Sequence, residues 1–552
     1  MTYRALLRLI LVALLVPAAC ACSSVSPQLA ASTAPLRTTA PSPPLPTQPL
    51  PTATAPPTAT EERRPAATAP STAAPSTVAS ALPASGAPST AAPTTTALPT
   101  PLRPGPSTLD SLGDPYYPLL GNGGYHVRHY MIDLRADVAK NVITSTVTLD
   151  ALATQPLPAF NLDFVGFTLT RVTVQDAPAR TARTAHELTI TPARPLRQGE
   201  SFTATVAYTG VPNPHIAQAI PISAGWNHYP TGIYVASEPD GAASWFPVND
   251  HPRDKATYTF RVTVPKPYVV AANGLLRSTH DQGTTTTYVW ETQHPLASYL
   301  ATVDIGTFVT QTSSGPGGLP IQNFFPPTLA PQATQVFSRT AAMIQFFSTV
   351  FGPYPFEAYG AIVPDTSLGF ALETQTRSVF GRDLVERSFA RRDDQVVAHE
   401  LAHQWFGDSV SVQTWADIWL NEGFATFAQW LWLEHTQGPA AFTAAVRNNY
   451  AASAQQHWPA PGAPPPGDLF NAGVYGRGGL TLAALRLRLG DEVFFRILRT
   501  YAARYRYGNA GTGDFIALAQ SVSQRDLQDF FAGWLYAPQM PAIPELGLAA
   551  SP

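Results

Sequence analysis

Short runs of alternating apolar and polar residues dominate the chain from Gly121 to about Gly306. Runs of this kind, separated by Gly, Pro and Asn, are typical of half-buried β-strands. The predicted strands are Asn141–Leu149, Phe167–Val174, Glu187–Pro192, Phe202–Tyr208, Thr257–Val264 and Thr285–Trp290. They predict an all-β domain. Within it, the composition of the segment from Glu238 to Pro252 indicates a polar loop between strands.

The hydrophobic period changes to that of helices in the second half of the chain. Ala333–Phe351 has helical spacing, and Gly352-Pro353 ends it. Two short strands of a small sheet, Tyr359–Val363 and Leu368–Thr374, come next. Apolar helical runs then precede a Pro-rich loop, and the last helical runs are Glu492–Tyr505, Thr512–Ser523 and Asp526–Tyr536. We expect the tryptophans of this region to pack in the core, namely Trp405, Trp415, Trp419, Trp430 and Trp432.

Residues 1–22 have the features of an export signal. Arg4 and Arg8 lie at an apolar run, residues 9–16, that is too short to span a bilayer. Cys20 follows small residues, which resembles the processing site of bacterial lipoproteins and would make Cys20 the lipidated N-terminus. The alternative is ordinary secretory cleavage at Ala19-Cys20-Ala21. We therefore expect an extracytoplasmic protein, lipid-anchored at the bacterial cell surface or secreted in soluble form.

The remaining composition indicates a spacer followed by two domains. Residues 23–110 are mainly Pro, Thr, Ala and Ser, which predicts a disordered spacer. The roughly 440 residues beyond it are too many for one core. We expect an all-β domain at 111–312, a catalytic domain at 313–545 and a tail at 546–552. The net charge of −3 gives no basis for nucleic-acid binding, and the part beyond the spacer contains no cysteine.

A metal-binding pattern lies in the second domain. His399 and His403 are four residues apart, so on a helix both imidazoles lie on one face and can reach one tetrahedral metal. Glu400 is placed to act on a metal-bound water, and Glu422 in the next helical run would complete a His2Glu site with an open fourth position. The alternative is a buried helix whose two histidines are satisfied by neighbouring side chains.

With these segments the chain resembles the aminopeptidase N type of zinc metallopeptidase, a gluzincin family, over roughly residues 120–540. The motifs that carry the resemblance are His-Glu-Leu-Ala-His-Gln-Trp-Phe-Gly-Asp from His399 and Trp-Leu-Asn-Glu-Gly-Phe-Ala from Trp419, with the family spacing between them. The resemblance implies an α+β multidomain fold in which an N-terminal all-β, saddle-like sandwich domain precedes a thermolysin-like α/β zinc catalytic domain. It implies one zinc ion held by His399, His403 and Glu422, with Glu400 as general base and Tyr475 stabilising the oxyanion. Asp417 and Thr426 are our expected hydrogen-bond partners of the zinc-ligand histidines.

The resemblance also implies a substrate-binding strand and a site for the substrate amine. Gly369-Phe370-Ala371-Leu372-Glu373 resembles the family's exopeptidase strand, with Phe370, Leu372 and Thr374 departing from the motif. Glu373 would bind the substrate's free α-amino group, together with Glu238. From the residues alone, Glu373 is as readily an edge charge in solvent.

The implied activity is release of N-terminal residues from peptides. The alternatives are a zinc endopeptidase, a lipid epoxide hydrolase that uses the same site, and a surface-tethered binding protein without activity. The expected partners are peptides with a free N-terminus, with no nucleic acid and with a membrane only through the lipid anchor. The family's large C-terminal helical domain is expected to be missing, so closure of the site stays open, as do the side-chain preference, the physiological substrate and the oligomeric state.

Overall fold

A computed structural model describes residues 102–105 and 108–550. All of these residues belong to one compact unit of the chain. The expected export signal, including Cys20, and nearly all of the expected spacer lie outside the described residues. Within the part that the structure describes, no helix combines the length and the apolar character needed to cross a membrane.

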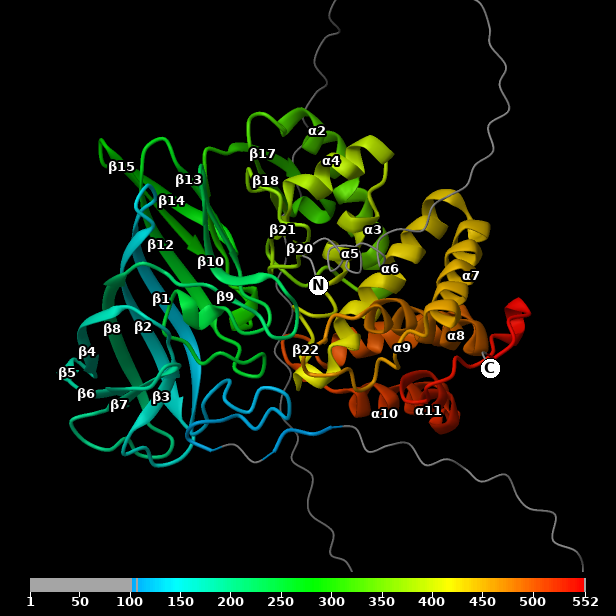
Figure 1. Cartoon of the computed structure of the whole chain (residues 1–552), viewed down its shortest axis with the longest axis horizontal. Coiled ribbons are helices and arrows are strands. Elements are labelled where there is room, and N and C mark those ends of the chain that lie inside the picture. The colour runs from blue at the N-terminus through cyan, green and yellow to red at the C-terminus, as the bar shows by residue number, and fades with distance from the viewer. Residues whose placement is uncertain (1–101, 106–107, 551–552) are drawn as a thin grey trace, which may run out of the picture. The chain divides into compact units, whose positions relative to one another are not determined.

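The described residues up to Phe325 form β-sheets joined by turns and 3-10 helices (Figure 1). The strands are β1 (Tyr125–Asp137), β2 (Val142–Ala153), β3 (Phe160–Asp163), β4 (Thr168–Val174), β5 (Ala177–Pro178), β6 (Arg180–Arg183), β7 (Glu187–Thr191), β8 (Ser201–Gly210), β9 (His215–Ile216), β10 (Ser223–Tyr229), β11 (Gly232–Ala236), β12 (Thr257–Pro265), β13 (Val269–Ala272), β14 (Leu275–Asp281), β15 (Thr285–Glu291), β16 (Val303–Gly306), β17 (Val309–Ser314) and β18 (Pro320–Phe325). The six predicted strands are therefore confirmed, as β2, β4, β7, β8, β12 and β15.

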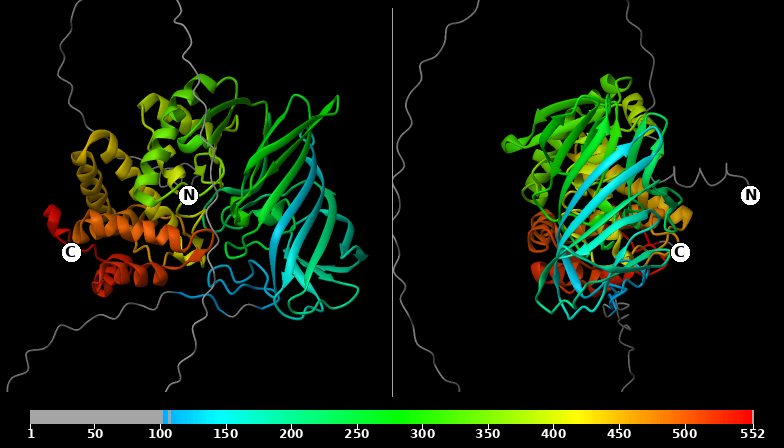
Figure 2. Two further views of the ribbon diagram at one scale, coloured as in Figure 1. Left: turned by 180° about the vertical axis from the view of Figure 1, so that it is seen from behind. Right: turned by 90° about the vertical axis from the view of Figure 1, so that its left-hand side faces the viewer.

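The largest sheet has eight strands in the order β14-β15-β12-β1-β2-β8-β4-β5, and its long strands run side by side in Figure 2. β1 and β12 pair in parallel, whereas β1 and β2 are antiparallel. Alternate side chains of β1 face the core, and a register shift between Val127 and His129 moves the inward set from odd to even positions. Tyr130, Ile132 and Leu134 therefore point inward and are fully buried. A second, five-stranded sheet has the order β13-β16-β11-β10-β9.

The part of the chain after β18 is mainly helical. Its helices are α2 (Ala330–Val336), α3 (Thr340–Phe351), α4 (Arg382–Arg391), α5 (Gln395–Ala402), α6 (Trp419–Gln437), α7 (Pro439–Gln456), α8 (Gly478–Leu489), α9 (Asp491–Arg504), α10 (Thr512–Ser523) and α11 (Gln528–Leu535). Its short strands are β19 (Ala361–Ile362), β20 (Ala371–Leu372), β21 (Ser378–Phe380), β22 (Ser411–Val412) and β23 (Asn509–Ala510). The predicted fold class, a β-rich N-terminal domain followed by an α+β domain, is confirmed.

Two predicted elements differ in detail. The helical segment predicted for Ala333–Phe351 is confirmed, including its end at Gly352, but a 3-10 turn at Phe337–Arg339 divides it into α2 and α3. The strand predicted for Leu368–Thr374 is reduced to β20. Residues 366–370 instead form a turn in which the Asp383 carboxylate accepts hydrogen bonds from the backbone N–H groups of Leu368 and Gly369. Gly369 has a φ of 81°, which favours glycine there.

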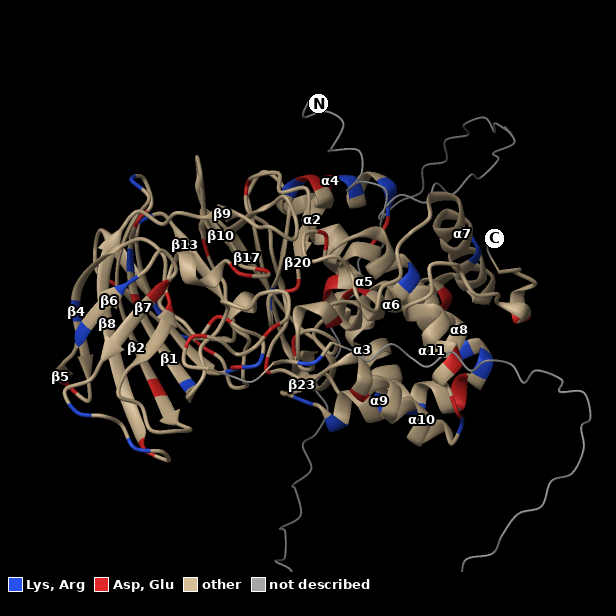
Figure 3. Ribbon diagram, turned by 60° about the horizontal axis from the view of Figure 1, so that its bottom comes forward, with Lys and Arg blue, Asp and Glu red and all other residues tan. Residues whose placement is uncertain are grey.

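Buried aromatic side chains fill the core of the helical part, and the five tryptophans predicted to pack there are all buried. Basic and acidic segments are interspersed along the ribbon in Figure 3.

The β-rich and helical parts meet through buried polar contacts. Arg377, after β20, donates to the carbonyls of Ala272 and Gly274, and Lys255 donates to those of Asp408 and Ser409. The segment around Glu238 lies in the β-rich part, and the motifs of His399 and Glu422 lie in the helical part.

Candidate metal centre and active site

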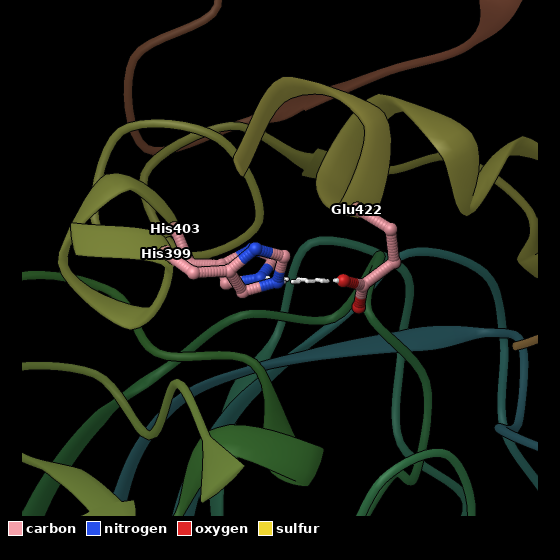
Figure 4. Close-up of side chains that lie close together, drawn as sticks. All are labelled: His399, His403 and Glu422. Atoms are coloured by element: carbon pink, nitrogen blue, oxygen red, sulfur yellow. Dashed lines mark hydrogen bonds and ion pairs between the residues drawn. The ribbon is translucent and has the colours of Figure 1, made fainter. Parts of the chain in front are cut away.

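The end of helix α5 and the start of helix α6 bring three predicted ligands together. Nε2 of His399 lies 3.1 Å from Oε2 of Glu422, and Nε2 of His403 lies 3.5 Å from the same oxygen. The ligand atoms of these residues all lie within 4.8 Å of one another. Figure 4 shows both imidazole rings directed toward the Glu422 carboxylate. All three side chains are buried.

Hydrogen bonds to the other ring nitrogens orient both histidines. Nδ1 of His399 donates to Oε1 of Gln429 over 3.2 Å, and Nε2 of Gln429 donates to the Gln395 carbonyl, which fixes the amide orientation. Nδ1 of His403 donates to the Phe406 carbonyl over 3.1 Å. Because each Nδ1 carries the proton, each Nε2 presents its lone pair to a metal.

The expectation that Asp417 and Thr426 hold the histidines is wrong. The Asp417 carboxylate instead accepts hydrogen bonds from Thr414 and from both the backbone and the side chain of Thr512. Gln429, which does contact His399, was missed. It lies seven residues after Glu422 on α6, so the two-turn spacing was the available signal.

Three further carboxylates surround these ligands. Ligand atoms of Glu373, Glu400 and His403 lie within 4.8 Å of one another, as do those of Glu238, Glu373 and Glu422. Glu238, Glu373 and Glu400 are only 6%, 2% and 5% exposed, which excludes the alternative of an edge charge in solvent for Glu373. The predicted polar loop around Glu238 is wrong in one respect, because nearly all of its residues are buried.

The concentration of buried acids perturbs their protonation. Burial raises the pKa of Glu400, Glu238 and Glu373, and neighbouring carboxylates add to the rise at each of them. Burial opposes ionisation of Glu422, but His403 and the hydrogen bond with His399 lower the pKa of Glu422 to about 2.

Oε1 of Glu238 and Oε1 of Glu373 have no hydrogen-bond partner among the described residues. A divalent cation and a substrate ammonium would supply the missing positive charge, so this donor set fits a His2Glu-bound metal.

Tyr475 lies beside these ligands. Its ring stacks on that of His399, with 6.0 Å between the centroids. It belongs to a π-helical turn, Gly473–Arg477, that leads directly into α8. Burial and the surrounding carboxylates raise the pKa of Tyr475 well above its ordinary value, so the hydroxyl keeps its proton and can donate a hydrogen bond.

A side chain next to the metal ligands connects the exopeptidase-like strand to α5. Nε2 of Gln404 donates to the Glu373 carbonyl over 3.0 Å, and Oε1 of Gln404 accepts from the Thr376 N–H over 2.8 Å. These bonds hold Glu373 beside His403, although the residues are far apart in the sequence. Phe370 and Ala371 are half-buried and Gly369 is exposed, which leaves this segment open at the edge of the site.

Two histidines and a glutamate around one point are the ligand set of zinc metallopeptidases. Family models agree: residues 126–300 match the peptidase M1 N-terminal domain, and residues 336–534 match the peptidase family M1 domain. The chain belongs to peptidase family M1.

Solved structures of similar architecture support this assignment. The M1 zinc metallopeptidase of Deinococcus radiodurans is 31% identical, with a TM-score of 0.73, and the match covers 79% of this chain and 98% of that one. A mutant M1 zinc metallopeptidase from the same organism, bound to a Tyr-Ser-Ala substrate, is 30% identical with a TM-score of 0.71, and the match covers 79% of this chain and 99% of that one.

Curated relatives include human glutamyl aminopeptidase, 28% identical over 319 residues, and aminopeptidase N of Streptomyces lividans, 26% identical over 329 residues. The matches cover 54% and 55% of this chain. The matched part spans only 33% and 38% of the length of these relatives.

Proposed function

We propose that the protein is a zinc-dependent aminopeptidase that releases single residues from peptides with a free N-terminus. The observation that carries this proposal is the pair of buried carboxylates of Glu238 and Glu373 beside Glu422, each with one oxygen that has no hydrogen-bond partner among the described residues. A protonated N-terminus supplies a cation for these acids, whereas an internal peptide bond does not. The charge arrangement therefore favours an exopeptidase over an endopeptidase. A lipid epoxide has no cation to offer these acids either.

His399, His403 and Glu422 would hold the zinc ion. When bound, zinc supplies a Lewis acid that polarises the scissile carbonyl and makes water more acidic. Glu400, held close to His403, takes the proton of the attacking water and delivers it to the departing amine. The Tyr475 hydroxyl donates to the oxyanion, and Glu373 and Glu238 fix the amine end of the substrate.

The test is a substrate panel assayed with the purified protein. It compares aminoacyl-anilides with their N-acetylated equivalents, each with and without a zinc chelator and with zinc quantified. We expect turnover of the free amines only, loss of turnover with the chelator, and recovery on addition of zinc. Equal turnover of blocked and free substrates would exclude the amine site and favour an endopeptidase, and turnover of a lipid epoxide alone would favour that alternative. A protein without zinc and without turnover would be a binding protein.

We also propose that the chain is exported and anchored by a lipid on Cys20. The support is the sequence of residues 1–22, in which Cys20 follows small residues after an apolar run. The test is expression of the full chain and of Cys20→Ser in a bacterial host, followed by fractionation and mass spectrometry of the N-terminus. We expect the Cys20→Ser variant to leave the membrane fraction. Identical fractionation of both proteins, with no lipid on Cys20, would favour soluble secretion.

A further inference from the structure

The hydroxyl of Tyr475 is carried on a backbone turn rather than on a regular helix. The turn Gly473–Arg477 has π-helical hydrogen bonding, which is rare and occurs mostly as single turns. We expect contacts with neighbouring segments to stabilise it. We propose that Arg477, bound to the carbonyls of residues 533–539, is the positioning residue that holds Tyr475 toward the metal centre. This inference rests on the proposed function, since it assigns the support of the oxyanion donor.

The guanidinium of Arg477 donates hydrogen bonds to five backbone carbonyls at and beyond the end of α11. Nε donates to Trp534 O over 2.9 Å and Nη1 to Pro538 O over 3.3 Å. Nη2 donates to the carbonyls of Gly533, Ala537 and Gln539 over 2.9, 2.5 and 3.2 Å. The last carbonyls of a helix have no partner within the helix, so the planar guanidinium satisfies several of them at once.

The burial of Arg477 makes this contact specific. The side chain is fully buried, and all five of these acceptors are backbone carbonyls rather than a carboxylate. A lysine at this position has one ammonium group with three donors and cannot span five carbonyls. The conservative substitution therefore breaks the contact while it keeps the charge.

Close contacts at two glycines support the same turn and the start of α8 on other sides. A Cβ on Gly476 would lie 2.1 Å from the ring of Trp458, and one on Gly478 would lie 2.9 Å from the Cα of Gly423. Gly423 directly follows the metal ligand Glu422, so the turn packs against the helix that supplies a ligand. Arg477 provides the polar contact to residues 533–539. Because Tyr475 lies two residues before Arg477, loss of that contact lets the hydroxyl move relative to the ligands.

The experiment is a double-mutant cycle with Arg477→Lys and Tyr475→Phe, assayed on an aminoacyl-anilide with zinc content measured for every variant. A displacement of about 1 Å can cost on the order of 100-fold in rate, so we expect Arg477→Lys to lower kcat about 10- to 100-fold. The KM should stay within about twofold and the zinc content should not change, because the amine site and the ligands are untouched. In the Tyr475→Phe background, Arg477→Lys should lower kcat less than about twofold.

The matched control is Arg486→Lys. Arg486 is a buried arginine on α8 that binds Glu434 and Asp491 and lies away from the turn. We expect this variant to keep kcat within about twofold. If Arg477→Lys does not fold, Arg477→Gln, which keeps two N–H donors, replaces it in the same cycle. Equal loss of kcat in both Tyr475 backgrounds, or no loss at all, would overturn the inference. The proposed function would still stand if the wild type were active. An inactive wild type with bound zinc would instead reject the proposed function.

Discussion

The amine site offers the sharpest prediction, because two acids from different domains must share one substrate cation. We expect Glu373→Gln to lower kcat/KM for free-amine substrates about 30- to 150-fold. Glu373 is 2% exposed and its Oε1 has no partner among the described residues, so the substrate ammonium is its expected partner. Loss of one member of a buried charge pair costs roughly 2–3 kcal/mol, which corresponds to that range. Glutamine has the shape of glutamate. Gln404 donates to the backbone carbonyl of residue 373, so the substitution does not remove that hydrogen bond.

The assay compares kcat/KM for an aminoacyl-anilide with that for its N-acetylated equivalent. The substitution should lower the ratio of the two values, because only the free amine loses a charge partner. The matched control is Glu357→Gln, which changes a buried glutamate that binds His294 and the backbone N–H of Gln293 outside the site. An equal loss with this control, or an unchanged ratio for Glu373→Gln, would show that Glu373 does not bind the amine.

Local patterns were sufficient to predict six strands of the β-rich part and the residues of the metal site. Side chains alternate between the two faces of a strand and return to the same face of a helix after each turn. The spacing of His399 and His403 therefore predicts that they share one helix face, without knowledge of the fold. The third ligand, Glu422, lies near enough in the sequence for the motif around it to indicate its role. Residues 403–418, which include β22 and the 3-10 helix Trp415–Asp417, connect α5 to the start of α6, where Glu422 lies.

Contacts between distant segments were not predictable from the residues alone. Glu238 follows β11 in the β-rich domain and Glu373 follows β20 in the helical domain, so only the fold brings them together. The family resemblance suggested the pair, whereas composition indicated a polar loop and a solvent-exposed edge. The error arose because buried polar segments are rare, and here the acids are retained beside a cation site.

Arg477 shows the same limit for support residues. In the sequence it is one basic residue in a Gly-rich run, and its acceptors are backbone carbonyls about sixty residues away that no side-chain pattern marks. Gln404 is similar, because its amide links α5 to the turn after Glu373. Residues that contact the metal or the substrate form recognisable motifs in a sequence. Residues that position them through contacts with backbone groups do not.

Three further predictions concern the base, the metal and the β-rich domain. Glu400→Gln should lower kcat at least about 1000-fold with an unchanged zinc content, since the substitution removes the proton acceptor but no ligand; retained turnover would reject its role as base. Gln429→Leu should weaken zinc binding about 10- to 100-fold in a chelator competition, because His399 loses its Nδ1 partner, and Gln429→Glu should restore binding; equal affinity in all three proteins would contradict the role of Gln429. Asp304 is a fully buried carboxyl in β16 that accepts a hydrogen bond from Thr302, and burial raises its pKa to about 8. Its unfolded form ionises near pH 4, so the stability that the protonated carboxyl gives is complete below about pH 4 and is lost as the pH rises toward 8. Asparagine does not titrate, so the free energy of unfolding of Asp304→Asn minus that of the wild type should grow by about 1–4 kcal/mol from pH 4 to pH 8 in denaturant titrations. A difference that stays constant over this range would mean that Asp304 is ionised in the folded protein.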